Sequence, residues 1–159
     1  MSYDIYIGEA EVFTPDAEDR EEITSLWVVV TRRAHPEAPC FDNDPCTKNE
    51  NHRHPGYSSW SEWCRAVGLN RLFFDGKDGL MVAHPGCVAL RKRHHTKILA
   101  ALHRWQKQHP GATPGFYPFD PNTDEVDGSV DPMLARLVWL EWWVRWSLAN
   151  CTNPALYNS

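Results

Sequence analysis

The sequence has little net positive charge and no long apolar run. Its 16 lysines and arginines are outnumbered by 21 aspartates and glutamates, which leaves a formal charge of −5. A field that attracts nucleic acid or an anionic membrane over the whole surface is therefore excluded, and we expect any anion site to be local. No apolar stretch reaches the roughly 18 to 20 residues that a membrane span needs.

Common catalytic signatures are absent as well. The sequence contains no G-x-S-x-G, P-loop, G-x-G-x-x-G or H-E-x-x-H, so it lacks the familiar nucleophile, nucleotide cradle and metal-binding helix. These absences favour a binding protein over an enzyme. The N-terminal stretch MSYDIYIGEA lacks the basic-then-apolar layout of a secretory signal, and we expect a cytoplasmic protein.

The cysteines do not form a disulfide framework. There are five, an odd number, in a chain of 159 residues that can bury a core without cross-links, so we expect reduced thiols. Cys40, Cys46, His52 and His54 are weak zinc candidates, because thiolate and imidazole are zinc ligands. Five residues separate the two cysteines, whereas closed zinc sites favour two to four. We predict no bound metal or other cofactor, with zinc as the alternative.

Period-two patterns predict the strands. Residues 3–12 alternate apolar and polar side chains, as in a half-buried strand. Residues 24–32 are β-branched and apolar on both faces, which is typical of a central strand. Residues 72–74 and 80–83, joined across a glycine-containing turn, are predicted to form a hairpin.

Three helices are predicted. An S-x-x-E capping box at residues 59–62 begins a short helix that ends near Gly68, and a second helix spans about 93–108. The last helix covers about 132–149, with Asp131 as N-cap and a proline in its first turn. We therefore predict one α+β domain over 1–159, with a small antiparallel sheet, three helices and irregular loops at about 34–57 and 110–130.

The last helix is apolar around almost its whole circumference, which requires cover on two sides. One arc is aliphatic with Glu141 in its middle, so we expect this carboxyl either to be neutral or to be held by an arginine or histidine, unless a small rotation of the helix brings it to solvent. The other arc carries Trp139, Trp142, Trp143 and Trp146. Two alternatives stay open for these indoles: a second layer of the core, or a homodimer interface or aromatic ligand platform.

Positive charge and histidine concentrate in a few places. The helix at 93–108 carries a basic stripe, which is either a solvated face or a contact for phosphate or an acidic protein. Two His-Pro-Gly turns present further imidazoles, and the first is followed directly by a tyrosine. The candidate ligand contacts are Arg53, His54, Tyr57, His84, Arg91, Arg93 and His94.

Most of the chain resembles small proteins encoded in bacteriophage genomes, a group without an assigned activity. The resemblance is carried by YDIYIG, HPGYSSW, GLMVAHPG, LARLVWLEWWVRWSLANC and the final NPALYNS. It implies a phage accessory protein that works in the host cytoplasm. Such a context suggests antagonism of host defence, either by holding a host protein or by sequestering a nucleotide signal.

The leading hypothesis from the sequence is a non-catalytic binder, homodimeric through its tryptophan-rich helix, that sequesters an anionic, nucleotide-like ligand. Arginine and histidine neutralise phosphate, and aromatic rings stack on a base. One alternative is an inhibitor that binds a host protein through the acidic segment 16–22 or the basic stripe. The other is a histidine- or zinc-dependent hydrolase built from His52, His54 and His84 with Glu141 or Asp75.

Overall fold

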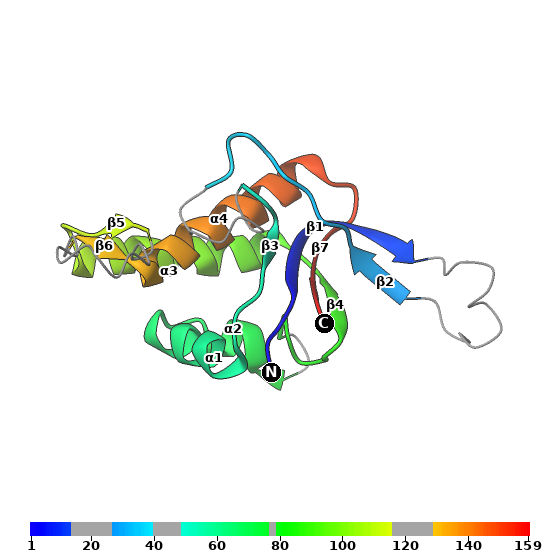
Figure 1. The fold of residues 1–159 in the computed structure, drawn as a ribbon, viewed down its shortest axis with the longest axis horizontal. Coiled ribbons are helices and arrows are strands. Elements are labelled where there is room, and N and C mark those ends of the chain that lie inside the picture. Colours follow the sequence, from blue (N-terminus) through cyan, green and yellow to red (C-terminus); the bar gives the residue numbers. More distant parts are fainter. Residues whose placement is uncertain (14–26, 40–48, 77–78, 116–128) are drawn as a thin grey trace, which may run out of the picture.

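A curled antiparallel sheet packed against helices forms the protein (Figure 1). The structure is a computed structural model that describes residues 1–13, 27–39, 49–76, 79–115 and 129–159. The sheet order is β2-β1-β7-β4, and β3 pairs with the start of β1. The strands are β1 (Ile5–Phe13), β2 (Trp27–Val30), β3 (His52–Arg53), β4 (Gly86–Ala89) and β7 (Pro154–Asn158).

Four helices are present in the described residues, together with a small second ladder. The helices are α1 (Tyr57–Ala66), α2 (Asn70–Phe74), α3 (Lys92–Gln108) and α4 (Pro132–Asn150). The ladder pairs β5 (Thr113–Pro114) with β6 (Val130–Asp131) in parallel. The predicted α+β class is confirmed, with one helix more than expected. None of the described helices is long and apolar enough to cross a membrane.

Helix α4 follows the predicted rules at its start. The Asp131 carboxylate accepts hydrogen bonds from the backbone N–H groups of Met133 and Leu134, at 2.8 and 3.2 Å, and a proline occupies the first turn. The helix packs against α3, and it also contacts β1 and β7 of the sheet. The prediction that this apolar helix is covered on two sides is therefore confirmed.

The predicted central strand at 24–32 is wrong in its position. Its described part is β2, which lies at the end of the strand order and pairs with β1 alone among the described strands. Trp27 and Val28 are 45% and 43% exposed, whereas a central strand buries both faces. A β-branched run specifies an extended backbone but does not specify how many neighbours it has.

The predicted hairpin at 72–83 is also wrong. Residues 70–74 form α2, although the chain does return: the N–H groups of Leu80 and Met81 bond to the carbonyls of Leu72 and Phe73, at 3.0 and 2.8 Å. Leu72 and Phe73 are adjacent, and both are buried in the main core. A helical turn permits this placement, because a strand sends adjacent side chains to opposite faces.

The predicted capping box of α1 is absent. The helix begins at Tyr57, two residues before the serine of the S-x-x-E motif, and Gly56 is its N-cap without a side-chain hydrogen bond. Burial of Trp60 and Trp63 against Phe73 holds this helix instead, with the two indole centroids 4.5 Å apart. Tertiary packing of an amphipathic face outweighs a missing cap in a helix this short.

Candidate functional site

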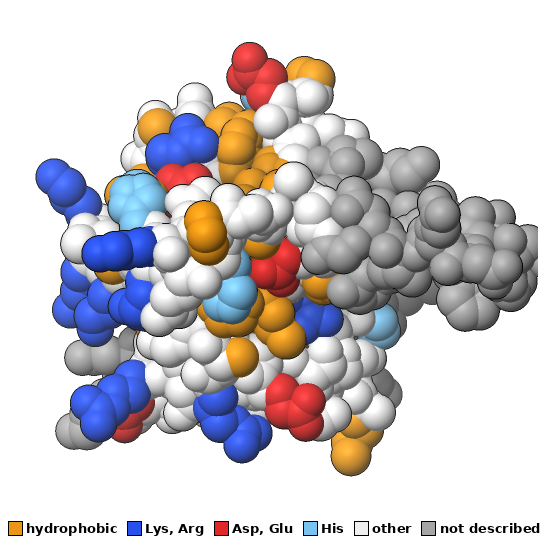
Figure 2. Space-filling view, turned by 90° about the vertical axis from the view of Figure 1, so that its left-hand side faces the viewer, with side chains coloured by type: hydrophobic (Ala, Val, Ile, Leu, Met, Phe, Trp, Pro, Cys, Tyr) orange, Lys and Arg blue, Asp and Glu red, His pale blue; other side chains and the backbone are white. Residues whose placement is uncertain are grey.

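A basic pocket opens between α2 and the first turns of α3. It has a volume of about 410 Å³. Its lining residues are Arg71, Leu72, Asp75, Gly76, Arg93, His94 and Lys97. Three permanent cations therefore face one carboxylate, in a protein whose overall charge is negative. Figure 2 shows lysine and arginine side chains gathered toward the left of the face that it displays.

Local helix geometry explains how the cations converge. Arg93 and Lys97 are four residues apart on α3, so they project from the same face of the helix. Arg71 reaches the pocket from α2, and no ion pair among the described residues involves Arg71 or Lys97. The first turn of the 17-residue α3 also borders the pocket, and a helix N-terminus adds partial positive charge there.

His94 has a structural contact in addition to its place in the pocket wall. It is 3% exposed, and its Nδ1 accepts a hydrogen bond from the Arg91 backbone N–H at 2.9 Å. This bond satisfies one of the backbone N–H groups at the start of α3 that have no carbonyl partner within the helix. Of the seven predicted ligand contacts, Arg93 and His94 line the pocket, and Arg91 is the N-cap residue directly before them.

A second cluster joins two histidines to one carboxylate on the sheet. Nε2 of His52 lies 2.9 Å and Nδ1 of His54 lies 2.6 Å from the same Oδ1 of Asp4. The Ser2 hydroxyl contacts the other nitrogen of His54 at 2.8 Å, and the Tyr6 ring stacks on His52 with centroids 4.5 Å apart. The two imidazoles of one extended segment therefore converge on one oxygen of the segment paired with it.

The cluster perturbs the pKa of Asp4. Partial burial raises this pKa, but the hydrogen bonds from His52 and His54 outweigh burial and hold it below the ordinary value of 3.8. A carboxyl with a lowered folded-state pKa stabilises the fold above its unfolded-state pKa, and this contribution is lost as the pH falls through the folded value. Asp4 is therefore a carboxylate at neutral pH.

We expect Asp4→Asn to destabilise the protein at pH 7, and we expect the difference from the wild type to shrink once the pH falls below about 4. The reason is that the wild-type carboxylate also loses its charge there. Urea denaturation of both proteins at pH 7, 4 and 3 measures the difference. A difference that grows in acid would contradict this assignment.

A third constellation links a tyrosine, a histidine and an asparagine. Nδ2 of the buried Asn158 donates to the carbonyls of Ala83 and Gly86, at 3.1 and 3.4 Å, which turns its Oδ1 toward His84 Nδ1 at 2.8 Å. An amide oxygen only accepts, so His84 carries its proton on Nδ1 and Nε2 accepts from the Tyr57 hydroxyl at 2.6 Å. The predicted contacts Tyr57 and His84 therefore form one hydrogen-bonded pair.

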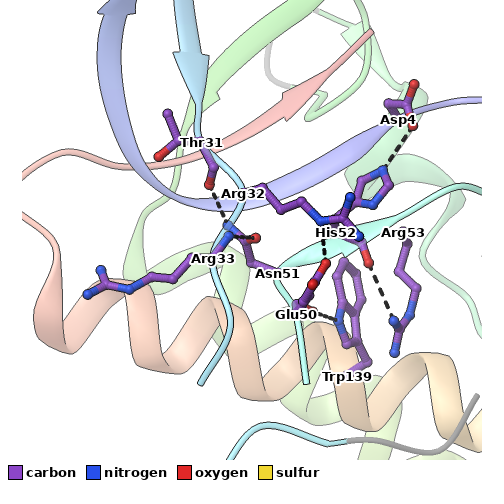
Figure 3. Close-up of polar contacts among 9 residues, drawn as sticks. All are labelled: Asp4, Thr31, Arg32, Arg33, Glu50, Asn51, His52, Arg53 and Trp139. Atoms are coloured by element: carbon purple, nitrogen blue, oxygen red, sulfur yellow. Dashed lines mark hydrogen bonds and ion pairs between the residues drawn. The ribbon is translucent and has the colours of Figure 1, made fainter. Parts of the chain in front are cut away.

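The predicted ligand contact Arg53 lies on strand β3 and is buried, so it does not project from an open loop. It is 8% exposed on β3, and its guanidinium lies 4.9 Å from the centroid of the Trp139 ring (Figure 3). The Trp139 indole N–H donates to the Glu50 carbonyl at 2.9 Å. Alternation along β3 explains the outcome: His52 projects from one face and Arg53 projects from the other, toward α4.

The tryptophan arc divides between core and surface. Trp139 and Trp143 are fully buried, so these two indoles belong to the core and are not available to an interface. Trp142 and Trp146 are half-buried and stack in parallel, 7° apart in plane. His35 lies beside both rings, and the Arg33 guanidinium lies 4.9 Å from the Trp146 centroid. A homodimer interface remains a prediction for Trp142 and Trp146 only.

Glu141 has the partners that its position required. His95 Nε2 lies 2.8 Å and Arg145 Nε lies 3.0 Å from its Oε1, and its side chain is 12% exposed. Of the alternatives for this carboxyl, contact with histidine and arginine is the one that the structure shows. The residues predicted for a hydrolase have separate contacts: His84 contacts Tyr57 and Asn158, Glu141 contacts α3, and Asp75 lines the basic pocket.

Three cysteines are described, and all are free thiols: Cys64, Cys87 and Cys151. Burial raises the pKa of each, for Cys151 to about 11, so none is a reactive thiolate at neutral pH. Cys40 and Cys46 lie outside the described residues.

No protein-family profile, curated protein or solved structure matches this chain.

Proposed function

We propose that this protein binds a small phosphate-bearing ligand, nucleotide-like in size, in the basic pocket between α2 and α3. The observation that carries the proposal is the convergence of Arg71, Arg93 and Lys97 on one cavity of about 410 Å³. Cavities of about 300 to 1,000 Å³ hold small-molecule ligands. Arginine forks bind phosphate oxygens in pairs, and a helix N-terminus adds backbone donors for the same charge.

The other lining groups suit the remainder of such a ligand. Leu72 supplies an apolar wall, and the Asp75 carboxylate accepts hydrogen bonds from hydroxyl or amino groups. Asp75 also repels a second phosphate on its side, so we place the phosphate toward Arg93 and Lys97. In a phage-type accessory protein, tight binding without turnover would sequester a nucleotide signal of host defence.

We expect Arg71→Ala and Lys97→Ala each to weaken ligand binding about 10-fold, because each removes one charged contact worth about 1 to 2 kcal/mol. Isothermal titration of the full chain measures this effect, with a panel of inorganic phosphate, nucleoside mono- and diphosphates, and cyclic dinucleotides. Affinity should fall as the salt concentration rises. Chromatography of the ligand after incubation should return it unchanged.

Lys107→Ala is the matched control, since Lys107 is an exposed cation of the same helix outside the pocket. It should leave the affinity unchanged. The proposal is wrong if no member of the panel binds, or if Lys107→Ala weakens binding as much as Lys97→Ala does.

A further inference from the structure

The cluster of Asp4, His52 and His54 has the composition and placement of a metal site. Each residue offers one ligand atom, and the three atoms lie within 4.8 Å of one another. We propose that these residues bind one divalent transition-metal ion, with Zn²⁺ as the reference ion. This site is separate from the basic pocket and does not depend on the proposed function.

Strand geometry brings the three donors together. His52 and His54 are two residues apart in an extended segment, so both side chains leave the same face. The antiparallel register pairs Ile5 with Arg53 and Tyr6 with His52, and continuing it by one residue places Asp4 opposite His54. The backbone bond from the Tyr3 N–H to the Pro55 carbonyl, at 2.9 Å, extends this pairing beyond β3.

The separations are close to those around a bound ion. In a tetrahedral zinc site, bonds of about 2.0 to 2.1 Å place the ligand atoms about 3.3 Å apart. The two nitrogens lie 2.9 and 2.6 Å from Asp4 Oδ1, so each nitrogen–oxygen pair needs to lengthen by less than about 1 Å. The two nitrogens lie within 4.8 Å of each other. Side-chain rotation of Asp4, which is 39% exposed, supplies a movement of that size.

Neighbouring side chains orient the imidazoles. The Ser2 hydroxyl contacts Nε2 of His54, leaving Nδ1 directed at the site, and such outer contacts fix the ring of a metal-binding histidine. His52 is held by the stacked Tyr6 ring, and its side chain is only 9% exposed. The most buried donor is therefore placed before any ion arrives, which lowers the entropic cost of binding.

The donor set indicates the class of ion. Two imidazoles and one carboxylate suit zinc, cobalt, nickel or iron, whereas magnesium and calcium prefer oxygen donors throughout. His54 and Asp4 are 54% and 39% exposed, so solvent reaches the site and water completes the coordination. Three protein ligands with one open position distinguish this arrangement from a closed structural zinc site.

The test uses the full chain after treatment with a chelator and desalting. Titration with ZnCl₂ should show one ion per chain, and Co²⁺ should give visible absorption bands of a four- or five-coordinate ion. We expect His54→Ala and Asp4→Asn to weaken Zn²⁺ binding at least 100-fold, since even outer-shell changes cost about 10- to 100-fold. Nitrogen-detected NMR should show Zn²⁺ shifting Nε2 of His52 and Nδ1 of His54.

Controls separate this site from other donors in the chain. His103→Ala removes an exposed histidine of α3 outside the cluster and should bind Zn²⁺ as the wild type does. His54 is itself exposed, so its variant should fold, which circular dichroism checks. The proposal is overturned if the wild type binds no Zn²⁺ when the ion is in 100-fold molar excess over the protein, or if His54→Ala binds Zn²⁺ as well as the wild type does. It is also overturned if Cys40→Ser abolishes Zn²⁺ binding that His54→Ala retains.

Discussion

Replacing Trp139 by alanine will lower the free energy of unfolding by about 3 to 5 kcal/mol, the range for a large aromatic residue deleted from a core. Trp139 is fully buried, so its removal leaves a cavity between α4 and the sheet. Its indole N–H also satisfies the Glu50 carbonyl at 2.9 Å. The guanidinium of the buried Arg53 would in addition lose the ring beside it, at 4.9 Å.

Trp142→Ala is the matched comparison for this experiment, because Trp142 lies on the same helix and is only half-buried. We expect it to cost about 1 to 2 kcal/mol, since less apolar area leaves water. Trp139→Phe should fall between the two, because it keeps an aromatic face but loses the N–H donor. Guanidinium denaturation followed by circular dichroism measures all three. Equal losses for Trp139→Ala and Trp142→Ala would show that this division between core and surface is incorrect.

The second large effect is expected at Asn51, which joins three backbone segments through one buried amide. Figure 3 shows its contacts with Thr31 and Arg33. Its Nδ2 donates to the carbonyls of Ile7 and Thr31, at 3.1 and 2.9 Å. Its Oδ1 accepts from the Arg33 N–H at 2.7 Å. Asn51→Ala leaves all three groups without these partners, and we expect a loss of about 3 kcal/mol or more.

Asn51→Asp tests whether the donor atoms matter. A carboxylate keeps the shape and still accepts from Arg33, but it cannot donate to the two carbonyls and it buries a charge. We therefore expect it to be at least as damaging as Asn51→Ala. Asn153→Ala, at an exposed position, should change stability by less than about 0.5 kcal/mol. Near-wild-type stability of Asn51→Asp would contradict the hydrogen-bond argument.

Trp139 and Asn51 also position the proposed metal site. Asn51 and Glu50 directly precede His52, and Trp139 holds the Glu50 carbonyl. Weaker Zn²⁺ binding in Asn51→Ala would therefore reflect loss of the strand rather than loss of a ligand. The basic pocket is built from α2 and α3, so its affinity for phosphate compounds should be far less sensitive to Asn51.

Local patterns determined the parts of the fold that depend on neighbouring residues. Asp131 and a following proline specify where α4 begins, and the apolar circumference of that helix requires cover on two sides whatever surrounds it. The kind of residue that contacts Glu141 could be anticipated for a similar reason, since a carboxylate in an apolar arc needs a cation or a hydrogen-bond donor. The strand near the N-terminus and the helix at 92–108 were also predictable from their periodicity.

The strands β4 and β7 and the helix α2 were not predictable, because each is short and is stabilised by distant partners. β7 pairs along β1, about 150 residues away in sequence, and no local signal records that pairing. The same reason applies to the sites. The H-x-H spacing and Arg93 are visible in the sequence, but Asp4 meets His52 across 48 residues. Arg71 reaches the pocket only because the fold brings α2 and the start of α3 to one cavity.

The sequence by itself therefore determined the class of the fold, the long helices and the need to cover and neutralise particular side chains. Only the tertiary structure decided which tryptophans are core, which cations share a pocket and which carboxylate joins the histidines. The physical reason is that helix periodicity and capping act over a few residues, whereas sheet register and side-chain convergence depend on contacts between segments far apart in the chain.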